Sequence, residues 1–238
     1  MKYIFKLICI VLTLVSHALL AQEESEYAIT IDDSLDNKWE KFVPSSIRIG
    51  VDVAGLAYNF IDPSRITYGA AADIDFHIYS AVFEYGMAQY DHSGDSASYQ
   101  SKGSYYRVGL DANFLNKDKS LNMFFFGLRF AHSKYDDSIE GIVKEAGWGY
   151  SEISRTQSNS KANWAELVIG VRLRVWKSLF MGYTTSLKVK KAVTTDNLIT
   201  PYYIPGYGVS ARKSNIGFNY YIYYKFAWKK KKIPKSKE

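Results

Sequence analysis

The chain has 238 residues, a formal net charge of +6 and a single cysteine, Cys9. That cysteine lies in the apolar N-terminal stretch, so the rest of the chain can form neither disulfides nor cysteine metal sites. The last ten residues, "KKKKIPKSKE", hold six lysines and one glutamate and so carry a net +5. Without this tail and the two lysines of residues 1–21, the body is near −1. A nucleic-acid partner is therefore not expected.

Residues 1–21 have the pattern of a secretory signal peptide. Lys2 and Lys6 precede a nine-residue apolar run over 7–15, and "ALLA" precedes Gln22. The apolar run is too short to cross a bilayer as a helix. We therefore expect an exported protein cleaved after Ala21, followed by an acidic, unpatterned periplasmic lead-in over residues 22–45.

Eight segments of alternating polarity follow Pro44, as expected for strands whose successive side chains point to opposite faces. All have at least the nine residues that a tilted strand needs to cross a bilayer. No stretch after residue 21 approaches eighteen apolar residues, so a transmembrane helix is not expected. The predicted strands are 46–57, 66–77, 80–89, 105–113, 122–131, 163–175, 179–189 and 215–228.

The connections between these strands alternate in length. Short ones follow the second, fourth and sixth strands, whereas longer ones cover 58–65, 90–104, 132–161 and 190–214. Outer-membrane barrels have short periplasmic turns, long external loops and an even number of strands. The chain over 46–228 is therefore predicted to be an all-β, eight-stranded antiparallel transmembrane up-and-down β-barrel, with a basic periplasmic tail over 229–238.

The two faces of the predicted strands differ in kind. One face is apolar, as in Phe124, Phe126, Leu128 and Phe130, while the other is ionisable and carries one glycine per strand. The interior of an eight-stranded barrel has room only for side chains, and glycines there would make space for arginines. The ionisable face is therefore predicted to point inward and the apolar face to meet lipid. The predicted interior network is Arg48, Asp52, Asp73, Asp75, His77, Glu84, Arg107, Asp111, Arg129, Glu166, Arg172, Arg174 and Lys188.

Charges in a narrow lumen are costly unless they are paired and hydrogen-bonded. We therefore predict mutual ion pairs that stabilise the fold and plug the interior. A proton or ion path along the same residues is the alternative.

One arrangement suggests chemistry, because Asp73, Asp75 and His77 share a strand face. Carboxylates beside a histidine can orient it as a base or bind a metal with it, and outer-membrane proteases and lipid A-modifying acylases are barrel enzymes. However, the second strand runs towards the periplasm, which places His77 at the periplasmic rim, and no serine partner is evident. We therefore predict no catalytic site, no metal and no cofactor.

The long connections carry the candidate binding surface. Trp148 and Tyr150 lie in "GWGYSEISR", and Tyr202, Tyr203 and Tyr207 lie in "LITPYYIPGYG". Rigid tyrosines are good contact residues for proteins and sugars. They are equally typical of the aromatic girdle at a membrane interface.

The segments "IRIGVDVAGLAY", "NMFFFGLRFAHS", "WAELVIGVRLRVWKSLFMGY" and "YYIPGYG" resemble a family of small outer-membrane barrels from Bacteroidota known only as a domain of unknown function. The resemblance covers about Ile47 to Phe226. It implies an outer-membrane location and an eight-stranded barrel, but no activity or site residue. The lysine tail departs from the aromatic chain end that is usual in such barrels.

The sequence thus predicts a non-enzymatic outer-membrane barrel with a structural or interaction role, through its loops or its periplasmic tail. The expected partners are outer-membrane lipid and an envelope protein. The barrel-assembly machinery is a further expected partner, because "NIGFNYYI" over 215–222 loosely fits its recognition pattern. Two alternatives remain open. One is a barrel enzyme acting on envelope lipid, and the other is a soluble lipocalin-like binder with the two faces reversed.

Overall fold

The computed structural model describes residues 43–115, 118, 120–145, 149–196 and 199–228. The predicted signal peptide, nearly all of the acidic lead-in, the lysine tail and Trp148 lie outside these residues. Within them, no helix is long and apolar enough to cross a membrane. The elements are β1 (Ser46–Asp52), α2 (Val53–Ile61), β2 (Arg65–Phe76), β3 (Tyr79–Ser93), β4 (Ala97–Asn113), β5 (Met123–Glu145), β6 (Gly149–Trp176), β7 (Leu179–Thr194), β8 (Tyr203–Ile204), β9 (Gly208–Val209) and β10 (Ser214–Ala227).

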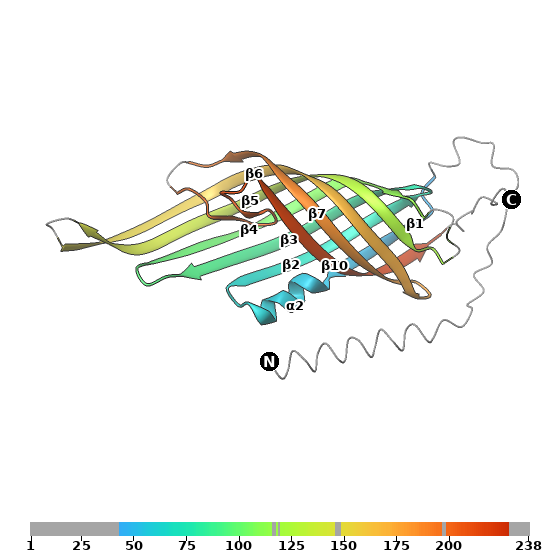
Figure 1. The fold of residues 1–238 in the computed structure, drawn as a ribbon, viewed down its shortest axis with the longest axis horizontal. Helices are drawn as coiled ribbons and strands as arrows, with labels where there is room; N and C mark the ends of the chain where they lie inside the picture. Colours follow the sequence, from blue (N-terminus) through green and yellow to red (C-terminus); the bar gives the residue numbers. More distant parts are fainter. Residues whose placement is uncertain (1–42, 116–117, 119, 146–148, 197–198, 229–238) are drawn as a thin grey trace, which may run out of the picture.

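Eight of these strands close into a barrel in the order β1-β10-β7-β6-β5-β4-β3-β2, and every neighbouring pair is antiparallel. The predicted eight-stranded antiparallel barrel is confirmed. The start of β1 and the end of β10 lie at the end of the barrel that carries the short turns between β2 and β3 and between β6 and β7 (Figure 1). At the other end, the β5–β6 hairpin extends far beyond the remaining strands (Figure 1).

The prediction of a strand over 46–57 is wrong for its second half. The strand stops at Asp52 and residues 53–61 form α2. The Asp52 side chain caps this helix, because its Oδ1 accepts hydrogen bonds from the backbone N–H groups of Ala54 and Gly55. A capping carboxylate ends the extended conformation and supplies two of the acceptors that the first helical turn requires.

The prediction of long loops over 90–104 and 132–161 is also wrong for most of their length. Residues 90–93 and 97–104 continue β3 and β4, and most of 132–161 continues the β5–β6 hairpin. Backbone pairing continues there although the outward positions on β5 have become polar, as at His132, Lys134 and Asp136. The polar composition marks the end of the apolar face rather than the end of the strand.

The apolar face points outward along the barrel. Ile49, Leu128 and Phe218 are 50%, 69% and 61% exposed, whereas the charged residues on the alternate positions are mostly buried. This outward apolar belt, defined as the exposed large hydrophobic side chains of β1–β7 and β10, includes Ile49, Val51, Tyr68, Phe83, Tyr85, Met87, Tyr106, Val108, Leu110, Phe124, Phe126, Leu128, Phe130, Leu167, Ile169, Leu173, Tyr183, Leu187, Val189, Ile216, Phe218, Tyr224 and Phe226. The orientation of the faces agrees with the prediction and is opposite to that of a lipocalin-like binder.

Glycines on the inward face make room for aromatic rings at some positions and for charged side chains at others, as at Gly109, where an added Cβ would lie 2.7 Å from Arg129 Cγ. A Cβ atom at Gly50 would collide with the Tyr223 ring, one at Gly86 with Tyr105, and one at Gly170 with Phe125. Each of these glycines is the direct pairing partner of the residue that carries the ring, so the neighbouring strand leaves space for the ring there.

Candidate functional site

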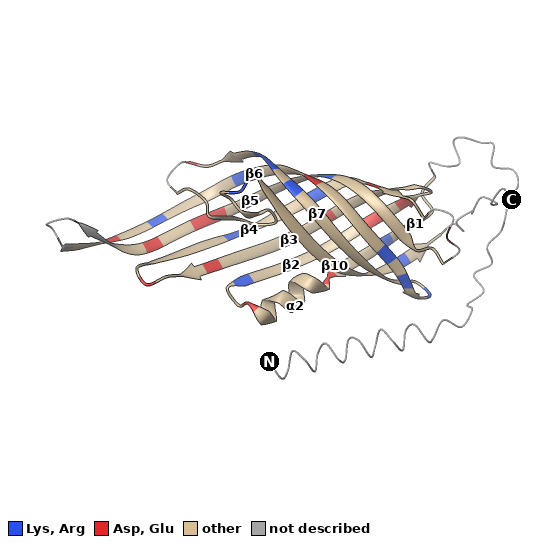
Figure 2. Ribbon diagram, in the orientation of Figure 1, with Lys and Arg blue, Asp and Glu red and all other residues tan. Residues whose placement is uncertain are grey.

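Nine charged side chains form a continuous chain of ion pairs inside the barrel, here called the ion-pair ladder. All nine are 4% exposed or less, and Figure 2 shows acidic and basic residues side by side on the strands. Each arginine lies between two carboxylates, so charges of opposite sign alternate. In order, the ladder is Asp75, Arg48, Asp73, Arg172, Asp111, Arg129, Glu84, Arg107 and Glu166.

Distances along the ladder are those of direct ion pairs. Arg48 Nε donates to Asp73 Oδ1 at 2.7 Å, and Arg107 Nη1 donates to Glu84 Oε2 at 2.8 Å. Arg129 binds the other oxygen of Glu84, so this carboxylate joins two arginines. The ladder ends at Glu166, whose Oε1 accepts the Trp164 indole N–H at 2.6 Å.

Above the ladder, the segment between β7 and β10 folds back into the barrel mouth as an inward hairpin, residues 203–209. Its turn is Ile204-Pro205-Gly206-Tyr207, closed by a hydrogen bond from Tyr207 N to Ile204 O at 3.1 Å. Gly206 has a φ of +80°, which matches the third position of a type II turn after proline. The turn therefore follows directly from the Pro-Gly pair.

Polar contacts from the barrel wall hold this hairpin. Ser101 Oγ donates to the Tyr203 carbonyl at 3.0 Å, and Lys188 Nζ donates to the Gly206 carbonyl at 2.6 Å. Tyr207 packs edge-to-face against Trp164, with ring centroids 5.6 Å apart. The hairpin tip is thus bound to β4, β6 and β7 and lies directly over the upper end of the ladder.

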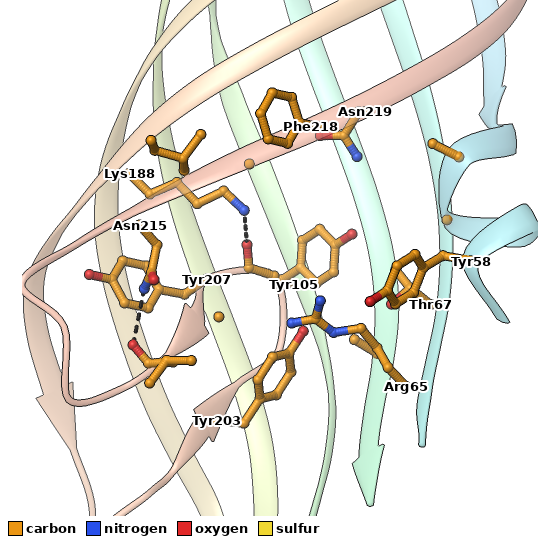
Figure 3. A pocket seen from close by; sticks show the side chains of 18 of the residues that line it. Tyr58, Arg65, Thr67, Tyr105, Lys188, Tyr203, Tyr207, Asn215, Phe218 and Asn219 are labelled. Atoms are coloured by element: carbon orange, nitrogen blue, oxygen red, sulfur yellow. Dashed lines mark hydrogen bonds between the residues drawn. The ribbon is translucent and has the colours of Figure 1, made fainter. Parts of the chain in front are cut away.

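A cavity of about 420 Å³ lies between the inward hairpin, α2, β2 and β10. Arg65 and Tyr203 point into it from one side and Lys188 from the other (Figure 3). The Arg65 guanidinium lies 4.9 Å from the centre of the Tyr203 ring and 5.8 Å from that of Tyr58. The volume falls in the range of small-molecule sites, and the lining combines aromatic rings with a few polar groups. Its lining includes Asp52, Ala54, Gly55, Tyr58, Arg65, Thr67, Tyr105, Arg107, Lys188, Tyr203, Tyr207, Arg212, Asn215, Ile216, Phe218 and Asn219.

A family model matches residues 1–231 of the chain. The chain belongs to the family described as "Domain of unknown function (DUF6048)". The expectation of a family with that kind of label is confirmed. A comparison with curated proteins gave no match. Among solved structures, the barrel is similar to "Crystal structure of Acinetobacter baumannii CarO2" at 10% identity and a TM-score of 0.41, over 77% of this chain and 99% of that chain.

In this DUF6048 chain, four predicted network residues lie outside the ladder. Asp52 is buried at the start of α2, where it also accepts a hydrogen bond from Asn219 Nδ2 at 2.6 Å. Lys188 is buried and binds the inward hairpin. Arg174 is half-buried near the short-turn end of β6. His77 follows the last residue of β2 and has a φ of +71°.

The expected alignment of His77 with Asp73 and Asp75 on one strand face is wrong. The β2–β3 turn begins at His77, and its left-handed backbone turns the residue away from the register of the strand. Both carboxylates are bound by Arg48. Within the described ranges, no group of three or more His, Cys, Asp or Glu side chains is placed to hold a metal ion.

Two of the candidate contact tyrosines are not on an exposed loop. Tyr203 and Tyr207 are 5% and 2% exposed because the inward hairpin carries them into the barrel, whereas Tyr202 and Tyr150 are 51% and 76% exposed. The cavity is also lined by Arg65, Tyr58 and Asn219, which no sequence pattern indicated. Pro205-Gly206 signalled the turn, but no local pattern signals that it points inward.

Proposed function

We propose that this protein is a non-enzymatic β-barrel of the outer membrane with a plugged interior, which has a structural or interaction role through its extended loops or its lysine tail. The outward apolar belt is the observation that carries the proposal. Water-soluble monomers rarely expose contiguous apolar patches of more than a few hundred Å². An outward apolar band with aromatic residues at its margins is instead typical of transmembrane barrels.

Aromatic residues lie towards both ends of this belt. Phe114, Trp176 and Trp228 are exposed at the short-turn end, and Tyr68, Tyr85 and Tyr106 are exposed towards the other end. Rings with one polar edge favour the lipid headgroup region. The signal-like residues 1–21 and the resemblance to small Bacteroidota barrels support the outer membrane as the location.

Two separate features support a plugged interior. The ion-pair ladder crosses the lumen with arginines and carboxylates that are bound to each other, and the inward hairpin covers its upper end. Opening a path would require breaking buried charge pairs, which costs about 3–5 kcal/mol for each charge left unpaired. The ladder is therefore better suited to holding the barrel in one register than to passing ions.

The arrangement of Asp73 and Asp75 supports a non-enzymatic role. Both carboxylates are bound to the Arg48 guanidinium, and the left-handed backbone of His77 takes that residue out of their strand register. The expected partners are outer-membrane lipid around the belt, the barrel-assembly machinery during insertion, and an envelope protein at the β5–β6 extension or the lysine tail.

Two measurements on one preparation test this proposal. The folded chain should sediment with outer membranes and migrate differently before and after boiling on a denaturing gel. In planar bilayers the wild type should show no single-channel steps. A variant that combines Glu84→Ser and Arg129→Ser with a Gly-Ser replacement of residues 201–210 should conduct, because both obstructions are then removed.

A soluble band without a heat shift would overturn the membrane barrel. Steady conductance by the wild type would overturn the plugged interior while leaving the barrel intact. A change in envelope lipid that is lost in a folded His77→Ala variant would overturn the non-enzymatic assignment.

A further inference from the structure

The barrel wall is incomplete on one side of the cavity. β1 ends at Asp52, which pairs with Tyr221 on β10, and its pairing with β2 ends at Val51 and Ala70. Residues 65–69 of β2 and 214–220 of β10 therefore have no strand between them on that side. Helix α2 lies there instead, beside β2 and β10 (Figure 1).

The helix itself is hydrogen-bonded to β2 at one edge of this gap, whereas in the described part of the chain β10 at the other edge is bonded only to the residue that caps the helix. On β2, Asn59 Nδ2 donates to the Thr67 carbonyl at 3.0 Å, and Thr67 N donates to Asn59 Oδ1 at 2.7 Å. On β10, the hydrogen bonds among the described residues reach only Asn219 and Tyr220, through the Asp52 cap. No side chain of α2 is buried, so the helix covers the gap without packing into a core.

The cavity lies at the unpaired edge of β10. Its lining includes the inward residues Asn215 and Asn219 of β10 together with Ile216 and Phe218, which face outward in the apolar belt. Successive side chains of a strand lie on opposite faces of a sheet. Residues from both faces of β10 border the cavity, which places it at the unpaired edge of this strand.

The inner part of the cavity is cationic. Asp52 is occupied by the helix cap and Asn219, and Arg107 is occupied by Glu84 and Glu166. Among the described residues, the other charged lining groups, Arg65, Lys188 and Arg212, form no ion pair. Arg65 Nε is buried and has no hydrogen-bond partner there.

The outer part of the opening is apolar. The lining residues Ile216 and Phe218 of β10 are 68% and 61% exposed. The helix sequence "VAGLAYNFI" contains no charged residue. A polar, cationic chamber therefore opens sideways onto an apolar surface, and the matching ligand has an anionic head and an apolar tail.

We propose that the cavity binds the phosphate or carboxylate head of an anionic amphiphile that enters sideways between α2 and β10 and leaves its tail along Ile216 and Phe218. Arg65 and Lys188 hold the head, and Arg212 lies at the rim. This inference rests on the proposed membrane location. The volume of about 420 Å³ accommodates a head group and a few methylene groups, not a whole lipid.

Dodecyl phosphate is a suitable probe and is added to the folded protein, without residues 1–21, in a nonionic detergent. Native mass spectrometry then gives the number of dodecyl phosphate molecules bound to each barrel. We expect one bound molecule per barrel. Arg65→Gln and Lys188→Gln should each weaken binding about ten-fold or more, as expected when a buried charged contact is lost. Arg155→Gln removes the same charge from the exposed part of β6 and should leave the affinity unchanged. Ala54→Trp, which narrows the side entrance, should also weaken binding.

The other outcomes are distinct. Equal competition by inorganic phosphate would overturn the amphiphile and indicate a soluble anion. Equal binding of dodecyltrimethylammonium, or binding that Arg65→Gln does not change, would overturn the cationic site. Each variant is first checked for the heat shift and for insertion into phosphatidylcholine vesicles. A wild type that fails these checks contradicts the membrane proposal itself, whereas one that passes and binds no dodecyl phosphate contradicts only the ligand site.

Discussion

Individual residues inside the barrel are matched in size across neighbouring strands. Gly86 is the clearest case, because the buried Tyr105 ring lies directly over it, and the same ring lies against Gly206 of the inward hairpin. Tyr105 also lies 4.8 Å from the Arg107 guanidinium. One missing side chain on β3 thus makes room for a ring that joins the wall, the ladder and the hairpin.

Gly86→Ala should therefore destabilise the folded barrel by about 1–3 kcal/mol, as overpacking does in a filled interior. Gly94→Ala is the matched control, because the nearest atom to an added Cβ is the Ala97 carbonyl oxygen at 3.5 Å. For each variant, stability is measured as the urea concentration at which half of the folded gel band is lost. Equal midpoints for the two variants would contradict the close packing on Gly86.

Asp137 shows how burial affects a charge beyond the apolar belt. It lies on β5 past His132, Lys134 and Asp136, and Tyr99 Oη donates to its Oδ1 at 2.6 Å. Burial raises the pKa of the Asp137 carboxyl above its ordinary 3.8, although the Tyr99 hydrogen bond acts in the opposite direction. The folded state therefore binds this proton more tightly than the unfolded state does.

The free energy of unfolding should consequently fall as pH rises from about 4 through this raised pKa. Asp137→Asn keeps an acceptor for Tyr99 but does not titrate. The stability of this variant relative to the wild type should therefore increase between about pH 4 and about pH 7. Urea midpoints of both proteins at the two pH values provide the test. A constant difference between them would show that burial does not raise this pKa.

At the scale of elements, Asp52 connects the end of β1, the start of α2 and the edge of β10. Its oxygens accept hydrogen bonds from Ala54 N, Gly55 N, Asn219 Nδ2 and Tyr220 N. The position of the helix across the unpaired edges therefore depends on one carboxylate.

Asp52→Ala should loosen α2 by about 0.5–2 kcal/mol, the usual effect of losing a helix cap. Hydrogen exchange of residues 53–61 should speed up correspondingly, while the paired part of β5 stays protected. Asp52→Asn retains an acceptor oxygen and should restore most of the protection. Unchanged exchange in Asp52→Ala would mean that the Asn59–Thr67 hydrogen bonds hold the helix without the cap.

For the whole molecule, the topology places the β5–β6 extension and the short turns at opposite ends. The chain beyond Cys9 has no cysteine, so single cysteines report on each end separately. Ser154 is exposed on the extension and Ser120 is exposed in the β4–β5 connection.

In intact cells, Ser154→Cys should react with a membrane-impermeant maleimide, whereas Ser120→Cys should react only after the outer membrane is permeabilised. The physical reason is that a barrel with its termini in the periplasm has its short turns on the same side. Reaction at Ser120→Cys but not at Ser154→Cys in intact cells would invert the topology.

The sequence alone was sufficient for the eight strands, their antiparallel order and the outward direction of the apolar face. These features depend on a period of two, which is local, and on the size of an eight-stranded lumen, which leaves room for side chains only. The arginines and carboxylates of the ladder could be named in advance for the same reason, whereas Asp137 lies in a segment that was expected to be a loop.

Only the tertiary structure decided which charges pair, where the "LITPYYIPGYG" segment goes and how the wall closes. The order of the ladder depends on strand register, as when Arg172 on β6 contacts Asp73 on β2 across the lumen. The inward path of Tyr203 and Tyr207 depends on partners up to about a hundred residues away, such as Ser101. The early end of β1 depends on the Asp52 helix cap, and this cap stabilises the fold only because α2 lies beside β2 and β10. Local periodicity sets the face on which a side chain lies, but contacts between distant strands are set by the closure of the barrel.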